Sequence, residues 1–341
     1  MRAGLSVPFL SFSFVFLFVL SGCTEPEANA VSLSGLTMGT TWSVEIAGAK
    51  ADRQQLNHDI NAILDDINGK MSTYLPDSEL SRLNQATDRE WKPLSKDLYR
   101  VITEALHITH ETGGAFDITI GPVVNLWGFG PEKHTTIPTD ADIAATLNKT
   151  GIDKIELRSS PPALKKFDPG VYLDLSAIAK GYAVDRIAGY LEQARFKNYM
   201  VEIGGEIRAR GKNAQGNAWR IGIEKPVADQ RTVERIIHLN NFSMATSGDY
   251  RNYFEQDSVR YSHTIDPRTG RPITHKLASV SVLHASAMTA DALATGLLVL
   301  GPEKGFELAQ QRGLAAFFII KNDNGFADTY TDAFNAFLLK K

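Results

Sequence analysis

Apolar residues recur at helical spacing in five segments of the chain. In residues 52–69 an apolar stripe from Leu56 to Ile67 repeats every three or four positions, which predicts an amphipathic helix. The same spacing predicts helices over 95–114, 176–194, 290–301 and 302–313. Residues typical of helix ends stand at these boundaries, namely Ser95, Ser176 and Thr289 at starts, Gly113-Gly114 at a stop, and Pro302 at a first position.

Alternating apolar and polar residues predict strands between these helices. The alternation covers 32–48, 199–211 and 218–226, and 231–248 is expected to be one strand that runs into a loop. Residues 314–321 have the composition of a buried strand. Because helices and strands are mixed and most strand neighbours are antiparallel, the pattern predicts an α+β fold with a mixed, mainly antiparallel sheet and packed helices. No linker rich in Pro, Gly or Ser interrupts residues 33–341, so we expect one large domain there.

The segment YSHTIDPRTGRPI (261–273) predicts a hairpin that carries a histidine. Asp266 suits the first position of a tight turn, Pro267 the second and Gly270 the left-handed exit, so 261–265 is expected to run in and 271–273 to run out. In a continuous strand, His263 and Ile265 would share one face. The pattern leaves open whether that face is core, surface or active site.

The amino-terminal segment predicts export. Residues 1–22 carry one cation, Arg2, and then an apolar run to Leu20, which is typical of a secretory signal peptide. The run ends in LSGC (20–23), which resembles the bacterial lipoprotein signal, and that resemblance implies a lipid on Cys23 and a polar tether over 23–32. The alternative is an ordinary signal peptide with a stray thiol. The lipoprotein is favoured because Cys23 is the single cysteine and has no disulfide partner.

Charge and motifs exclude several classes of function. Removing residues 1–22 takes away Arg2 and no acid, so the formal net charge goes from −3 to −4, and nucleic-acid binding is not expected. The chain has no CxxC, HExxH, Walker A or GxSxG motif. Its histidines show no spacing typical of metal ligands.

Two predicted helix starts carry candidate chemistry. Asp174 precedes the helix predicted to start at Ser176, and Lys180 lies about one turn inside, where a helix terminus favours anions. The alternative, a plain capped junction with a solvated lysine, is favoured by spacing alone. Asp291 and Thr295 are four residues apart near the start of another helix, so they share a face, and their oxygens suit Mg²⁺. Equally, Asp291 could interact only with the dipole of its own helix, and Thr295 could form a hydrogen bond only to its own backbone.

Other short stretches are weaker candidates. Gly204-Gly205 interrupts a strand pattern, which suggests a bulge or a close approach of a ligand. Ser247-Gly248 stands where a loop leaves a strand and could form a backbone nest. Phe116 and Tyr74 could stack on a planar ring. Each of these features alone is more often core or turn than ligand site.

Taken together, seven motifs resemble one family, the FAD:protein FMN transferases or ApbE family, in its lipoprotein form. The motifs occur in order and span about 33–338: MGTTW (38–42), GGAFD (113–117), DLSAIAKGYAVD (174–185), IGGEIRARG (203–211), TSGDYRNY (246–253), SHTIDPRTGRP (262–272) and DALATG (291–296). The resemblance implies a Mg²⁺-dependent enzyme that splits FAD at its pyrophosphate. It implies that FMN is transferred to a Ser or Thr hydroxyl of a target protein and that AMP is released. The implied targets are flavin subunits of the sodium-pumping NADH:quinone reductase and of the related Rnf complex.

The resemblance also implies roles for individual residues. It implies FAD contacts for Met38, Tyr74, Ala115, Phe116, Asp117, Asp174, Lys180 and Ile265. It implies that Mg²⁺ is held by the Ala177 carbonyl and by the side chains of Asp291 and Thr295. It implies that His263 acts on the acceptor hydroxyl.

The chain departs from the family pattern at two positions. Some members carry a further Asp where this chain has Ala294, so the metal is expected to have one carboxylate fewer. Lys180 stands at a position that varies between acidic and other residues, and a cation there is expected to strengthen FAD binding and to slow product release.

Competing functions and the cellular location are separated by simple observations. A Mg²⁺-dependent FAD pyrophosphatase would give free FMN and AMP with no labelled protein, and a non-catalytic flavin-binding lipoprotein would need neither Mg²⁺ nor His263. A solute-binding lipoprotein would need two lobes and a hinge, which the pattern does not show.

Because the implied acceptors lie in the inner membrane, we expect a lipid anchor there, on the periplasmic side.

Overall fold

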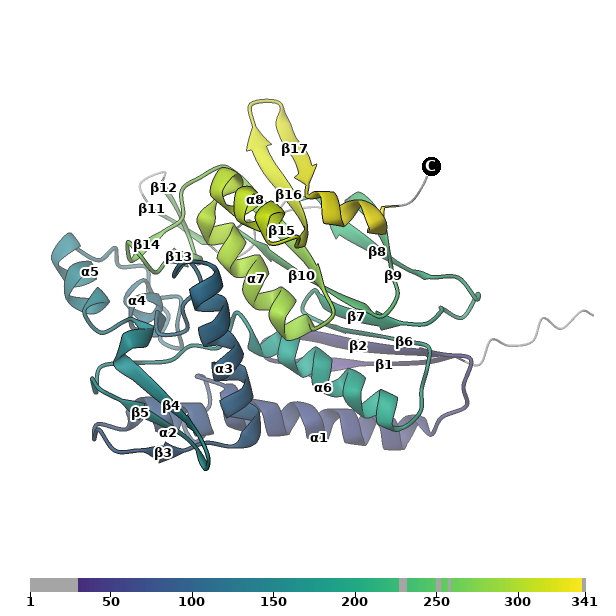
Figure 1. Cartoon of the computed structure of the whole chain (residues 1–341), viewed down its shortest axis with the longest axis horizontal. Coiled ribbons are helices and arrows are strands. Elements are labelled where there is room, and N and C mark those ends of the chain that lie inside the picture. Colours follow the sequence, from purple (N-terminus) through teal and green to yellow (C-terminus); the bar gives the residue numbers. More distant parts are fainter. Residues whose placement is uncertain (1–29, 227–231, 250–252, 257–258, 339–341) are drawn as a thin grey trace, which may run out of the picture.

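The computed structural model describes residues 30–226, 232–249, 253–256 and 259–338 (Figure 1). The predicted signal peptide (1–22) and Cys23 lie outside the described residues. The first strand begins at Ala30, three positions before the domain start expected at 33. Within the described ranges, no helix has both the length and the apolar character required to cross a membrane.

An eight-stranded sheet forms the centre of the molecule, and each neighbouring pair in it is antiparallel. This confirms the predicted α+β class with a mainly antiparallel sheet. The strands, in their order across the sheet, are β1 (Ala30–Thr37), β2 (Thr40–Ala47), β6 (Tyr199–Ile203), β7 (Glu206–Arg210), β10 (Phe242–Gly248), β15 (Leu277–His284), β16 (Ala315–Asn322) and β17 (Gly325–Tyr330).

Each face of this sheet packs against a different core, because successive side chains of a strand point to opposite faces. In β16, Ala316 and Phe318 belong to the main core, whereas Phe317 and Ile319 belong to the second one. The main core lies under the helices α1 (Arg53–Met71), α2 (Glu79–Gln85), α3 (Lys96–Glu111), α6 (Ala179–Gln193), α7 (Ala287–Leu300) and α8 (Pro302–Gln311). The second core lies under β8 (Trp219–Glu224), β9 (Val233–Leu239) and the 3₁₀ helix η2 (Asp332–Phe337).

Smaller elements complete the fold around one end of the sheet. Two helices and a short hairpin share a third apolar cluster that includes Trp127 and Ile265. The remaining elements are β3 (Lys92–Pro93), β4 (Ile155–Ser159), β5 (Pro162–Lys166), α4 (Gly121–Leu126), α5 (Asp140–Leu147), η1 (Ile152–Lys154), β11 (Tyr253–Gln256), β12 (Val259–Ser262), β13 (Ile265–Asp266) and β14 (Arg271–Pro272).

Most predicted elements are present, but two helix starts differ from the prediction. Ser95 caps α3 as predicted, and its hydroxyl accepts a hydrogen bond from Leu98 N. Ser176, however, is not an N-cap: α6 begins only at Ala179, and Ser176 N donates to the Asp174 carboxylate within a turn. The cap of α7 is Ser286 rather than Thr289, so this helix begins at Ala287 and Asp291 stands in its second turn.

Two predicted strand regions also differ in detail. Gly204-Gly205 is the turn of the β6–β7 hairpin, with φ of 61° and 104°, and not a bulge inside one strand. Segment 231–248, expected as one strand running into a loop, forms two strands, β9 and β10. The predicted turn at 266–270 is present, since Gly270 N donates to Asp266 O at 2.8 Å and Gly270 has φ of 67°.

Helices α6 and α7 cross in close contact at Gly181. A Cβ on Gly181 would overlap the carbonyl group of Ala287 and the backbone of Met288. Asp185, one turn further along α6, accepts hydrogen bonds from Ser286 Oγ and from the backbone N–H groups of Ala287 and Met288 at 2.7–3.1 Å. An α6 carboxylate therefore satisfies the free N–H groups at the start of α7 and fixes the two helices against each other.

Replacing Gly181 should open this crossing. We expect Gly181→Ala to lower the free energy of unfolding by about 1–3 kcal/mol, because the added methyl group overpacks a backbone contact. Gly189→Ala is the matched control in the same helix, where a Cβ meets no atom within 4 Å. It should be neutral or stabilise by up to ~1 kcal/mol, since alanine is the better helix former. Urea unfolding measures both variants, and equal unfolding free energies would contradict the tight crossing.

Candidate functional site

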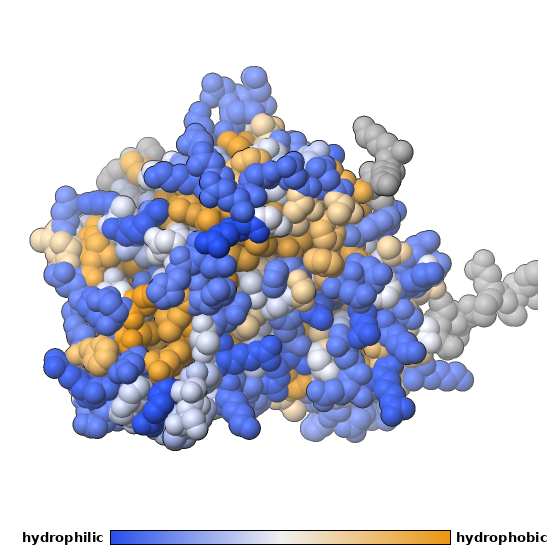
Figure 2. Space-filling model, in the orientation of Figure 1, coloured by the Kyte–Doolittle hydropathy of each residue, from blue (hydrophilic) through white to orange (hydrophobic). Residues whose placement is uncertain are grey.

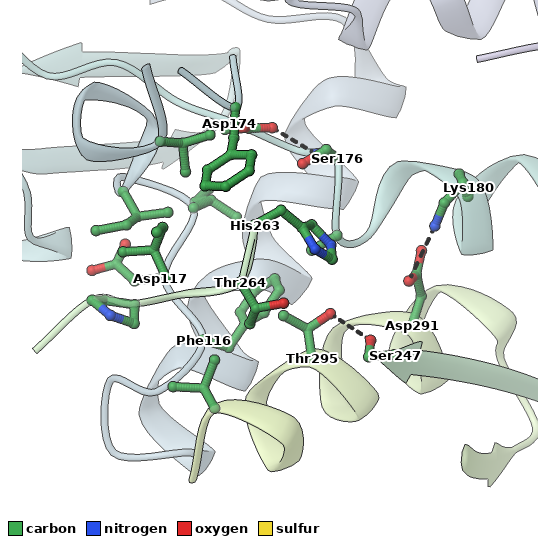
Figure 3. A pocket seen from close by; sticks show the side chains of 18 of the residues that line it. Phe116, Asp117, Asp174, Ser176, Lys180, Ser247, His263, Thr264, Asp291 and Thr295 are labelled. Carbon is green, nitrogen blue, oxygen red and sulfur yellow. Dashed lines mark hydrogen bonds and ion pairs between the residues drawn. The ribbon is translucent and has the colours of Figure 1, made fainter. Parts of the chain in front are cut away.

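A cavity of about 410 Å³ lies where the starts of α6 and α7 meet the β13–β14 hairpin (Figure 3). It adjoins a second cavity of about 910 Å³, which runs toward the β1–β2 turn, and the two share lining residues that include Tyr74, Asp174 and Lys180. All residues predicted to contact FAD, metal or acceptor line one cavity or both: Met38, Tyr74, Ala115, Phe116, Asp117, Asp174, Ala177, Lys180, His263, Ile265, Asp291 and Thr295. Residues far apart in the sequence therefore form one continuous site.

The charged centre of the site is a lysine held between two buried carboxylates. Lys180 Nζ lies 3.0 Å from Glu206 Oε1 and 3.6 Å from Asp291 Oδ1. Gly181 N donates to the other Asp291 oxygen at 3.0 Å. Glu206 and Asp291 are each only 3% exposed. Lys180 is thus the partner that a buried carboxylate requires. It is not the solvated lysine that a plain capped helix start would carry.

Burial strengthens the coupling among these groups. Burial raises the pKa of Glu206 above its ordinary value, the adjacent Lys180 ammonium group opposes that rise, and the nearby Asp291 adds to it. Burial by itself would lower the pKa of Lys180, but Asp291 and Glu206 outweigh it and raise that pKa above its ordinary value. Lys180 therefore keeps its positive charge inside the cavity.

Oxygen atoms line the wall beside Asp291. Thr295 lies one turn further along α7, and its hydroxyl is 2.9 Å from Ser247 Oγ at the end of β10. Ala177 lies in the turn before α6 and lines the same cavity. Ala294, by contrast, is fully buried in the main core and is not among the lining residues.

A second group of residues forms the wall between α3 and α4. Phe116 is buried and contributes apolar surface. The Asp117 carboxylate accepts hydrogen bonds from Thr119 N and Thr119 Oγ1, both at 2.7 Å, and burial raises its pKa. Both residues follow the glycine stop of α3, which turns the chain back toward the cavity.

Asp174 and Tyr74 stand where the two cavities meet. Asp174 is held by the N–H of Ser176 at 2.8 Å and faces both cavities. Tyr74 is 58% exposed, so its ring is available at the mouth. Burial, followed by the charge of Asp174, raises the pKa of Tyr74.

His263 and Ile265 reach the cavity by a route that differs from the prediction. The strand breaks after Ser262, and Thr264 N donates to the Ser262 hydroxyl at 3.2 Å in place of a ladder bond. His263 therefore stands in a bend between β12 and β13, and the expected face of a continuous strand does not exist. Both residues nevertheless line the cavity, and in Figure 3 the His263 ring points into the space near Ser176 and Thr295.

Aromatic packing holds this hairpin in place. The His263 ring makes an edge contact with Phe129 at 6.3 Å between centroids. Ile265 is buried in the third apolar cluster, and Trp127 Nε1 donates to Gly270 O at 2.8 Å, which ties the turn to the end of α4. The turn therefore acts as scaffold for the histidine.

Glu206 is the site residue that the sequence interpretation missed. A signal was present, because strand register places Glu206 opposite Ile203 and Arg208 opposite Val201, so charged residues face the apolar side of the sheet. Such a charge requires a buried partner. The partner, Lys180, lies on a different element and is not adjacent in the sequence.

The chain is similar to known proteins over most of its length. Residues 38–318 match the ApbE family. The chain is 49% identical over 327 residues to an FAD:protein FMN transferase of Vibrio cholerae, covering 95% of this chain and 97% of that one. It is 50% identical over 323 residues to a protein of the same name from Haemophilus influenzae, covering 92% and 93%. The solved flavin transferase ApbE from Vibrio cholerae has a TM-score of 0.85 at 47% identity, covering 91% of this chain and 100% of that one. The chain therefore belongs to the ApbE family and is a transferase.

Proposed function

We propose that this protein transfers FMN from FAD to a Ser or Thr hydroxyl of a target protein and releases AMP, with Mg²⁺ as cofactor. One observation carries the proposal: a single cavity holds an oxygen-rich wall at Asp291 and Thr295, a cation at Lys180 and an imidazole at His263. These are the groups that a phosphoryl-type transfer needs, because such a reaction depends on positioning and charge neutralisation.

The donor atoms present fit Mg²⁺. Asp291 is buried with a hydroxyl oxygen one turn away at Thr295, and Ala177, whose carbonyl would be a further ligand, lines the same cavity. In the part of the chain that the structure describes, no group of three or more His, Cys, Asp or Glu residues could hold a metal. A site with few carboxylates suits Mg²⁺, which usually keeps waters and binds substrate phosphates. When bound, Mg²⁺ would neutralise the pyrophosphate charge and stabilise the leaving AMP.

The residues of the two cavities divide the binding of FAD. The Lys180 ammonium group and the positive end of the α6 dipole favour the pyrophosphate. The apolar and aromatic surfaces of Met38, Tyr74 and Phe116 suit planar rings, and the Asp117 carboxylate can accept hydrogen bonds from ring N–H groups.

The transfer replaces one bond to phosphorus with another. The acceptor oxygen forms a bond to the phosphorus of the FMN half, and the bond from that phosphorus to the bridging oxygen breaks, so that the oxygen leaves with AMP. His263 takes the hydroxyl proton and later gives it to solvent. A neutral imidazole suits this role near pH 7.

We also propose where the protein is located and which proteins it modifies. A lipid on Cys23 would hold the enzyme at the periplasmic side of the inner membrane. Target subunits of the sodium-pumping NADH:quinone reductase or of the Rnf complex would be within reach there. The support is the signal-like sequence of residues 1–23 and the family membership.

Mixing the protein with FAD, Mg²⁺ and a candidate acceptor should give an acceptor heavier by the mass of a bound FMN. Mass spectrometry should locate the flavin on a Ser or Thr, with AMP released in equal amount, and EDTA should abolish the product. AMP and free FMN without labelled acceptor would indicate a pyrophosphatase. Bound FAD without products would indicate a non-catalytic flavin-binding protein.

His263→Ala should lower the rate of transfer by ~10²–10⁴-fold, because a positioned general base contributes that much. FAD affinity should stay within a few-fold, since the ring packs against Phe129 and the hairpin turn is held independently. His107→Ala is the control, because His107 is exposed on α3 and not among the cavity-lining residues. Stopped-flow transfer rates and FAD titrations measure the two effects, and equal loss of both would refute the role of base.

The intact mass of the protein extracted from membranes should correspond to a chain that begins at Cys23 and carries acyl groups. Cys23→Ala should remove the acyl mass, because the thiol is the attachment point. A mature chain that begins elsewhere, or one with a free thiol, would contradict the lipoprotein assignment.

A further inference from the structure

The two carboxylate oxygens of Glu206 have different surroundings in the cavity. It opens β7 directly after the Gly204-Gly205 turn and lines the same cavity as Asp291 and Thr295. Its Oε1 pairs with Lys180 at 3.0 Å. Its Oε2 is buried and accepts no hydrogen bond from the described residues. Burying a carboxylate with half of its acceptor capacity unused is costly, so this residue calls for an explanation beyond packing.

The lysine lies closer to Glu206 than to Asp291. The two N–O distances are 3.0 and 3.6 Å. The second oxygen of Asp291 accepts from Gly181 N, whereas Glu206 Oε2 has no hydrogen-bond partner among the described residues. Figure 3 shows Lys180 and Asp291 facing each other at one side of the cavity. If Glu206 were uncharged, Asp291 would be the single anion left for the ammonium group.

That competition matters for any cation at Asp291. Two positive charges about 4 Å apart repel each other strongly inside a protein, and a divalent ion doubles the repulsion. A lysine that paired with Asp291 would therefore have to be displaced before a divalent cation could bind. The flexible stem of lysine permits that movement, provided that another anion receives the ammonium group.

We propose that Glu206 is a positioning residue that competes with Asp291 for the Lys180 ammonium group and receives that group when a divalent cation binds at Asp291. The proposal rests on the proposed function, because it assumes a cation site at Asp291. In this arrangement Glu206 would neutralise the charge of Lys180 without contacting the metal.

Three variants test the proposal with Mn²⁺ alone as the probe, measured by the loss of the free-ion electron paramagnetic resonance signal. Glu206→Gln keeps the shape but removes the charge, and should weaken Mn²⁺ binding by at least ~10-fold as Lys180 turns to Asp291. The double variant Glu206→Gln with Lys180→Met should bind Mn²⁺ within about three-fold of the unsubstituted chain, because the competing cation is gone. A purely structural role would not predict this rescue.

Glu202→Gln is the matched control, since it removes the same charge next to the same turn, from a side chain that is not among the cavity-lining residues. It should leave the Mn²⁺ affinity unchanged. A double variant as weak as Glu206→Gln would overturn the proposal and make Glu206 a direct ligand, and an unchanged affinity in Glu206→Gln would overturn it as well. If the unsubstituted chain bound no Mn²⁺, the metal site itself would fail, and the proposal with it. Thermal unfolding without metal verifies that every variant is folded.

Discussion

The crossing of α6 and α7 at Gly181 is the contact on which the site depends. Because glycine lets the two backbones touch, Lys180 on one helix reaches Asp291 on the other, and Gly181 N itself donates to that carboxylate across 110 residues of sequence. Asp185 strengthens the crossing by accepting hydrogen bonds from the start of α7. The hydrogen bonds to the Asp185 carboxylate thus help to set the distance between Lys180 and Asp291 in the cavity.

The antiparallel sheet determines what else reaches this point. The β6–β7 turn places Glu206 beside Lys180, and the end of β10 places Ser247 beside Thr295. The β1–β2 turn brings Met38 to the adjoining cavity. Since hairpins of an antiparallel sheet return the chain to the same edge, separate segments can each supply one group to a common site.

The balance of charge in the cavity links the structure to the chemistry. Two buried carboxyl groups share one ammonium group, so the cavity carries an excess of negative charge when both carboxyl groups are ionised, and that excess favours a cation. In the proposed reaction the pyrophosphate of FAD is anionic, and Lys180 together with a bound metal would supply the positive charge that it needs. A cavity that holds both signs close together can bind such a substrate and stabilise the charge that moves to the leaving group.

Local patterns were enough to predict the five longest helices, most strands and the turn at 266–270, because capping, periodicity and turn chemistry act between near neighbours in the sequence. The short helices α2, α4 and α5 were not predicted. Local patterns also identified Asp291 and Thr295 as a pair on one face, since helical spacing alone determines it. They did not predict that α6 starts at Ala179, that the strand breaks at His263, or that Glu206 joins the site. Those features depend on packing between distant segments. The sequence by itself determined which residues could do the chemistry, whereas the tertiary structure decided which of them meet, because a buried charge is stable only where another element supplies its partner.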